Sequence, residues 1–108
     1  ETPEQVEGEI RSLVDGIEGE VRTTFIRYPF EVDENEAVVE AVRRHAGGPE
    51  TIGVPFWADS AVFQAAGIPT VVFGPGGEGA HAVEEWVSLD DAERCAEIYL
   101  AVAEDLCG

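Results

Sequence analysis

A single histidine, His81, is the residue whose position most strongly suggests chemistry. It follows an apolar run at residues 69–73 and a glycine-rich loop at residues 74–80. A neutral imidazole at the end of a strand is a natural zinc ligand, but one histidine cannot form a metal site. The sequence offers almost no other ligands close to it. His81 is therefore either one ligand of a larger site or a structural histidine that hydrogen-bonds within the fold.

The glycine-rich loop before His81 has three interpretations. Gly74, Gly76 and Gly79 match the dinucleotide pattern G-x-G-x-x-G, but no helix start follows until Ser88, and Pro75 lacks a backbone N–H that could hold phosphate. A plain glycine-rich turn is the second interpretation. In the third, the glycines let the backbone approach a ligand, so that its N–H groups meet a substrate carboxylate beside a metal. The third fits the neighbouring histidine best.

The composition excludes two classes of partner. The chain has 108 residues, with 23 Asp and Glu against six Arg and no Lys, for a net charge of −17. Such a field repels nucleic acid and anionic lipid, and no apolar run approaches the ~20 residues that span a bilayer. Acidic surfaces without lysine suit a salt-rich cytoplasm, so we expect a cytoplasmic protein and hypothesise a halophilic source.

The two cysteines do not predict a disulfide. Cys95 and Cys107 fall on one predicted helix, about 18 Å apart at ~1.5 Å per residue, which is beyond disulfide reach. We interpret them as two small buried thiols. The sequence begins at Glu1 without Met, and we expect it to be a piece of a longer protein.

Helix signals occur at four places. Thr2, Pro3 and Gln5 form a capping box with proline in the first turn. Asp33 is expected to cap a second helix that ends at Gly47, and Asp59 a short third helix that ends at Gly67. The last helix opens at Ser88. Its apolar stripe is Ala92, Cys95, Ala96, Tyr99, Val102, Ala103 and Leu106.

Strand signals alternate with these helices. Residues 21–28 are rich in β-branched and aromatic side chains, residues 51–57 form a short second run, and residues 68–73 suit a strand buried on both faces of a parallel sheet. The order αβαβαβα predicts an α/β architecture.

Three segments together resemble one enzyme superfamily in order and spacing. They are residues 56–60 (FWADS), 66–76 (AGIPTVVFGPG) and 79–87 (GAHAVEEWV). The superfamily is that of the dinuclear zinc metallopeptidases and deacylases, which includes acetylornithine deacetylase, succinyl-diaminopimelate desuccinylase, aminoacylase and glutamate carboxypeptidase. The resemblance covers essentially the whole chain, and its specific part is residues 67–87.

The resemblance implies a domain organisation. Residues 1–29 would be the last helix and strand of a ferredoxin-like lid domain that usually mediates dimerisation, which implies a homodimer. Residues 30–108 would be the C-terminal part of a three-layer α/β/α catalytic domain.

The resemblance also implies a reaction, hydrolysis of an amide bond in N-acyl amino acids or small peptides. A water bound to two zinc ions, for which cobalt is an alternative, attacks the carbonyl. His81 matches the C-terminal zinc ligand, while the other ligands and the general-base glutamate would precede Glu1, so the fragment alone is expected to be inactive. The resemblance also places four residues at substrate-binding positions: Asp59, Gly74, Pro75 and Gly76. Judged without the resemblance, Asp59 is better explained as a helix cap. Glu85 matches an acidic position that orients a ligand or caps a turn.

Trp57 departs from the family, several members of which carry a small or hydroxyl residue at that position, so the exact substrate stays open. A non-catalytic α/β association module is the alternative function. A His-x-Asp pair and a Glu-Glu pair upstream would favour the enzyme.

Overall fold

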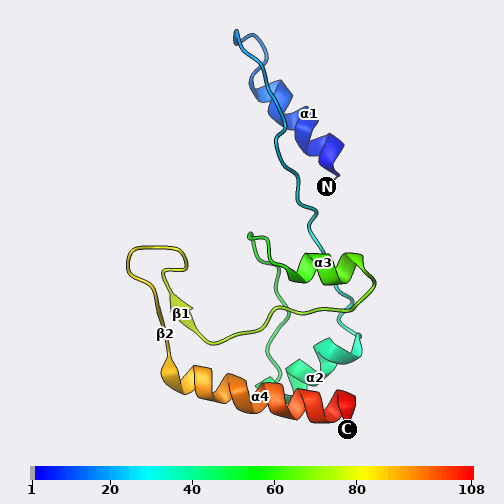
Figure 1. Cartoon of the computed structure of the whole chain (residues 1–108), viewed down its shortest axis with the longest axis vertical. Helices are drawn as coiled ribbons and strands as arrows, with labels where there is room; N and C mark the ends of the chain where they lie inside the picture. The colour runs from blue at the N-terminus through cyan, green and yellow to red at the C-terminus, as the bar shows by residue number, and fades with distance from the viewer. Residues whose placement is uncertain (1) are drawn as a thin grey trace.

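The computed structural model describes residues 2–108 and contains four helices and two short strands. The helices are α1 (Pro3–Leu13), α2 (Ala37–Ala46), α3 (Ser60–Ala65) and α4 (Leu89–Cys107), and the strands are β1 (Gly77–Glu78) and β2 (Trp86–Val87). This mixture of helix with a little sheet fits the α/β class. The order is α1, α2, α3, β1, β2, α4 (Figure 1).

Helices α1 and α4 begin where the sequence predicts. The Thr2 hydroxyl accepts a hydrogen bond from the Gln5 backbone N–H at 3.3 Å, and the Gln5 side chain accepts one from the Thr2 N–H at 2.7 Å. At α4, the Ser88 hydroxyl accepts from the Asp91 N–H at 3.2 Å. Both caps satisfy N–H groups that a helix start otherwise leaves unpaired.

Helices α2 and α4 pack against each other and hold most of the buried apolar side chains. Figure 1 shows the two helices together at the end of the molecule opposite α1. The side chains of Val39, Ala41 and Val42 on α2 and of Cys95 and Ile98 on α4 are buried. Val39 and Val42, and likewise Cys95 and Ile98, are on the i, i+3 spacing that aligns residues along one helix face.

The three strands expected at residues 21–28, 51–57 and 68–73 do not form within residues 2–108. The prediction of a strand buried on both faces at 68–73 is also wrong, because Ile68 and Val72 are about half exposed, at 54% and 48%. A strand requires a partner along its length. Residues 21–27 and 54–57 lie near each other, with the Arg27 guanidinium over the Trp57 ring, but the only backbone ladder in the described residues joins β1 and β2. The β-rich composition alone therefore does not produce a sheet here.

Two local predictions are also wrong. The Asp33 carboxylate does not cap α2; it accepts hydrogen bonds from the backbone N–H (2.9 Å) and side chain (2.7 Å) of Asn35, an Asx turn that precedes the helix. Glu36 occupies the N-cap position without a side-chain hydrogen bond. Cys107 is exposed at the end of α4, so only Cys95 is a buried thiol, and both are free.

The chain is elongated and open. Its radius of gyration is 18.5 Å and its extents are 58 × 36 × 21 Å, whereas a compact domain of this length has a radius near ~13 Å. Its accessible surface is 8838 Å², against about 5,800 Å² for a folded monomer of this mass. Residues 2–108 therefore do not close around one core. No helix in this range combines the length and apolarity needed to cross a bilayer.

Candidate functional site

A β-hairpin carries the histidine singled out by its position. Strands β1 and β2 pair antiparallel, with Gly77 opposite Val87 and Glu78 opposite Trp86. The Ser88 N–H donates to the Gly76 carbonyl at 3.0 Å, which extends the pairing to the first residue before α4. Residues 79–85 form the loop at the hairpin tip. This hairpin was not predicted from the sequence, because glycine and glutamate are poor strand residues.

Two glycines are required by the hairpin itself. A Cβ on Gly77 would overlap the carbonyl oxygen of Trp86, and a Cβ on Gly79 would overlap that of Glu84. Gly79 also has φ of 77°, which side-chain-bearing residues rarely adopt. Gly74 has no heavy atom within 4 Å of such a Cβ. The interpretation of residues 74–80 as a plain glycine-rich turn therefore explains Gly77 and Gly79. It does not explain Gly74, because packing among residues 2–108 leaves room there for a side chain.

His81 occupies a left-handed conformation on an exposed turn. Its φ is 66°, and it is the one non-glycine residue with positive φ in the described chain. The Ala82 N–H donates to the Gly79 carbonyl at 2.7 Å, so His81 is the third residue of a tight turn, where positive φ is typical of type II geometry. Backbone strain of this kind costs about 1–3 kcal/mol and clusters at functional sites. His81 is exposed.

Glu85 lies next to His81 across the base of the turn. Its Oε2 accepts a long hydrogen bond, 3.4 Å, from the backbone N–H of His81. The carboxylate therefore contacts the backbone that sets the orientation of the histidine. The imidazole itself forms no hydrogen bond with any other residue in the range 2–108.

The loop before the hairpin is anchored at both ends. The Tyr99 hydroxyl on α4 donates to the Phe73 carbonyl at 2.6 Å, and the two rings meet edge to face with centroids 5.9 Å apart. At the other end, Gly76 accepts from Ser88 at the start of α4. Helix α4 therefore fixes the positions of Gly74, Pro75 and Gly76. Tyr99 was expected only as a core residue, and its hydroxyl partner could not be read from the helix pattern.

Asp59 is not brought to the hairpin. It occupies the N-cap position of α3 with helical dihedrals, φ −59° and ψ −19°, and its side chain makes no capping hydrogen bond. The cap interpretation of its carboxylate is therefore wrong. Figure 1 shows α3 and the hairpin loop well separated. The neighbouring Ser60 hydroxyl is buried without a hydrogen-bond partner in the described chain.

Within residues 2–108, only His81 is available as a ligand of the proposed metal site. Across residues 2–108, no group of three or more His, Cys, Asp or Glu side chains is placed to hold an ion. A zinc site uses three or four protein ligands. An exposed imidazole on a fixed turn can serve as one of them, provided that other polypeptide supplies the rest.

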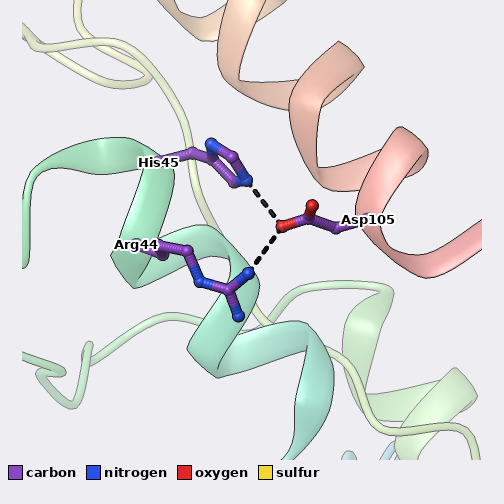
Figure 2. Close-up of polar contacts among 3 residues, drawn as sticks. All are labelled: Arg44, His45 and Asp105. Carbon is purple, nitrogen blue, oxygen red and sulfur yellow. Dashed lines mark hydrogen bonds and ion pairs between the residues drawn. The ribbon is translucent and has the colours of Figure 1, made fainter.

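The other histidine, His45, belongs to the scaffold. Figure 2 shows its Nε2 2.7 Å from Oδ2 of Asp105, an atom that also lies 2.9 Å from Nη1 of Arg44. These contacts join the end of α2 to the end of α4. The hydrogen bond from His45, with the charges of His45 and Arg44, lowers the pKa of Asp105 below its usual range. His45 lies in the last turn of α2, and Asp105 on α4 is its partner.

Comparison with protein-family models gives one match over nearly the whole chain. Residues 3–105 match the model described as Peptidase family M20/M25/M40. No solved structure matches the chain.

Proposed function

The chain belongs to the peptidase family M20/M25/M40, and from this premise we propose that it forms the C-terminal portion of a zinc-dependent amidohydrolase. The coarse assignment, a hydrolase of the peptidase or amidohydrolase kind, follows from the family. The proposed substrates are N-acyl amino acids or small peptides. The proposed protein is cytoplasmic and dimerises through residues 1–29.

The observation that carries the proposal is the placement of His81. It lies in the loop at the tip of a hairpin whose base is bonded to Ser88 at the start of α4, in a left-handed conformation that is uncommon for residues other than glycine. A structural histidine buried in a core would not need this turn. An exposed imidazole on a constrained turn is available to a metal that other donors also hold.

Each neighbouring residue has a role in the proposal. His81 would hold one zinc ion, and Glu85 would keep the turn in place through the His81 N–H. Gly74, Pro75 and Gly76 would line the carboxylate end of the substrate, and Asp59, which lies apart from the hairpin in this structure, would contact another part of the substrate. The other ligands and the general base would come from polypeptide that precedes Glu1. Zinc, when bound, would lower the pKa of a water and polarise the amide carbonyl.

The test is replacement of His81 by Ala in the protein that carries the complete ligand set. We expect at least a ~100-fold fall in kcat/KM on N-acetyl amino acids, because a ligand of a reacting metal is lost, together with loss of bound zinc by elemental analysis. His45→Gln is the matched control, since it removes the chain's other histidine and should leave zinc content unchanged. Unchanged turnover and metal content in His81→Ala would refute the proposal.

A non-catalytic association module is the second candidate. The observation that favours it is the open shape of the chain, whose accessible surface of 8838 Å² leaves many apolar side chains exposed, among them Leu13, Ile52 and Val83. A chain that buries little of its apolar surface by itself can bury more against another polypeptide. Full zinc occupancy with measurable hydrolysis would exclude the module, whereas association without metal binding would favour it.

A further inference from the structure

The Phe73 carbonyl oxygen links helix α4 to the loop that the proposed function assigns to the substrate. Within residues 2–108 this oxygen accepts one hydrogen bond, from the Tyr99 hydroxyl at 2.6 Å. The two rings meet edge to face, with centroids 5.9 Å apart, which holds the phenol in place. Tyr99 is in the middle of α4, the helix that packs on α2. The hydroxyl is therefore presented by the best-packed part of the described chain.

The far end of this loop is held by a different set of contacts. The Gly76 carbonyl accepts a hydrogen bond from the Ser88 N–H at 3.0 Å. Oδ2 of Asp91 lies 2.9 Å from the position that a Cβ on Gly76 would occupy, so the start of α4 lies directly against this glycine. Neither contact involves Gly74. Removing the Tyr99 hydroxyl would therefore release the near end of the loop and leave the far end and the hairpin in place.

The hydrogen bond to Phe73 sets the direction of the Gly74 N–H. The Phe73 carbonyl and the Gly74 N–H belong to one trans peptide unit, whose planarity points the two groups in opposite directions. Because Tyr99 holds the carbonyl toward α4, the N–H points away from α4. A peptide whose carbonyl accepts a hydrogen bond is polarised, which makes its N–H a stronger donor. Within residues 2–108 no acceptor is bonded to this N–H, and the next residue, Pro75, has no N–H.

We propose that Tyr99 is a positioning residue, which aims the Gly74 N–H at the carboxylate of the substrate by holding the Phe73 carbonyl. The inference rests on the proposed function, which places that carboxylate at Gly74, Pro75 and Gly76. Hydrogen bonds to a carboxylate are stronger than those to a neutral amide, so the direction of this N–H affects the binding of a free acid more than that of its amide. Tyr99 acts through Phe73, so its loss should weaken substrate binding and leave the chemical step nearly unchanged.

The experiment compares Tyr99→Phe with the parent in the protein that carries the complete ligand set. The variant loses the hydroxyl and keeps the ring that packs on Phe73. We expect KM for N-acetyl-L-alanine to rise about 10-fold and kcat to stay within ~2-fold. N-acetyl-L-alaninamide, measured as a competitor, should inhibit both proteins within ~2-fold of each other. Tyr28→Phe is the matched control, because it removes the chain's other tyrosine hydroxyl, and it should change neither constant.

NMR reads the Gly74 N–H directly and needs no hydrolysis. Phe73 and Gly74 form the one Phe–Gly step in the 108 residues, so phenylalanine labelled with ¹³C at the carbonyl and ¹⁵N-glycine mark this amide, and Gly74→Ala confirms the signal. In Tyr99→Phe the amide proton should move upfield, because the peptide is no longer polarised by the hydroxyl. N-methanesulfonyl-L-alanine, whose sulfonamide is not hydrolysed, should shift the parent signal with saturation, and Tyr99→Phe should require about 10-fold more of it.

Failure of this proposal and failure of the proposed function give different results. If the parent neither holds zinc nor hydrolyses the substrate, the proposed function fails, and the Gly74 signal decides alone: a saturable shift that weakens in Tyr99→Phe supports the proposal. Four results would overturn it. They are a Gly74 signal that does not move in Tyr99→Phe, no saturable shift of that signal in the parent, equal weakening of the acid and the amide, and equal weakening by Tyr28→Phe.

Discussion

The α2–α4 pair and the hairpin that carries His81 differ in almost every physical respect. The helix pair buries Val39 and Ala41 to 1% exposure and Ile98 to 6%, and Asp105 joins the helix ends. The hairpin has two residues in each strand, all exposed. The apolar burial that stabilises the chain is therefore in the helices, and the residues suited to chemistry lie outside them.

The two regions are joined through α4. Ser88 both caps this helix and closes the hairpin, and Tyr99 holds the segment before the loop. The hairpin is too small to be stable by itself, and helix α4 holds its turn in position. Perturbing the helix pair should unfold the chain, whereas perturbing the hairpin should displace His81 and leave the helices intact.

The largest effect should come from the helix core. We expect Ile98→Ala to lower the free energy of unfolding by about 2–5 kcal/mol, because it removes buried methylene groups and leaves a cavity. Urea denaturation followed by circular dichroism measures this change. Leu100→Ala on the same helix is the control: its side chain is 62% exposed, and the cost should stay within ~0.5 kcal/mol. Equal costs would mean that the helix pair is not the stable part.

The next effect should be confined to the hairpin. Gly79→Ala should destabilise the hairpin by more than ~1 kcal/mol, because alanine at φ of 77° is strained and its Cβ would overlap Glu84. Hydrogen exchange at the Ser88 amide, which donates to Gly76, should accelerate while exchange in α4 stays slow. Gly74→Ala is the matched control, with open space at its Cβ. Equal acceleration in both variants would contradict the hairpin's role.

Helix starts could be predicted from the sequence because their determinants are local. The Thr2–Gln5 box and the Ser88–Asp91 cap each lie within four residues, and both form as expected. The buried face of α4 was partly wrong: Ile98 is buried, while Tyr99, placed in the predicted stripe, is 49% exposed. The spacing of apolar residues predicts the buried face of a helix to within about one residue, and packing against the partner helix determines which of those residues are buried.

Strands and the site depend on contacts between distant residues, and the sequence was less informative there. Residues 68–73 have strong β composition but no paired neighbour within the described range, while the weakly β-forming Gly77 and Glu78 do pair because a short loop returns the chain to them. The position of His81 after the glycine loop was visible in the sequence. Its left-handed turn and its contact with Glu85 involve residues at most four positions apart, and the sequence named Glu85 but not the turn. Its separation from Asp59 depends on contacts between distant residues.

A smaller effect distinguishes the two helix caps. Ser88→Ala should cost about 1 kcal/mol, because its hydroxyl accepts the Asp91 N–H at the start of α4. Asp59→Ala should change the free energy of unfolding by less than ~0.5 kcal/mol, since its carboxylate makes no capping bond at α3. Thermal or urea unfolding measures both. A larger loss in Asp59→Ala would show that its carboxylate stabilises the fold and is not free for a ligand.

The smallest effect concerns the ion pairs that join α2 to α4. The hydrogen bond from His45 lowers the pKa of Asp105 in the folded chain below its usual value near 3.8. At a pH between the lowered pKa and the usual one, the Asp105 carboxyl group is therefore more protonated in the unfolded state than in the folded state. The stability contributed by Asp105 is therefore complete above that usual value and is lost as the pH falls through the lowered one. Because the three side chains are 28–62% exposed, salt should screen the effect.

Asp105→Asn removes this titration with little change in shape. We expect the acid limb of a plot of unfolding free energy against pH to be shallower in the variant than in the parent, with the two curves parallel at higher pH. Glu97→Gln, an exposed acid on the same helix, should leave the acid limb unchanged. If Asp105→Asn and the parent lost stability along the same acid limb, the contacts of Asp105 with His45 and Arg44 would add no stability to the helix pair. Apolar burial alone would then explain why the helix pair is more stable than the hairpin.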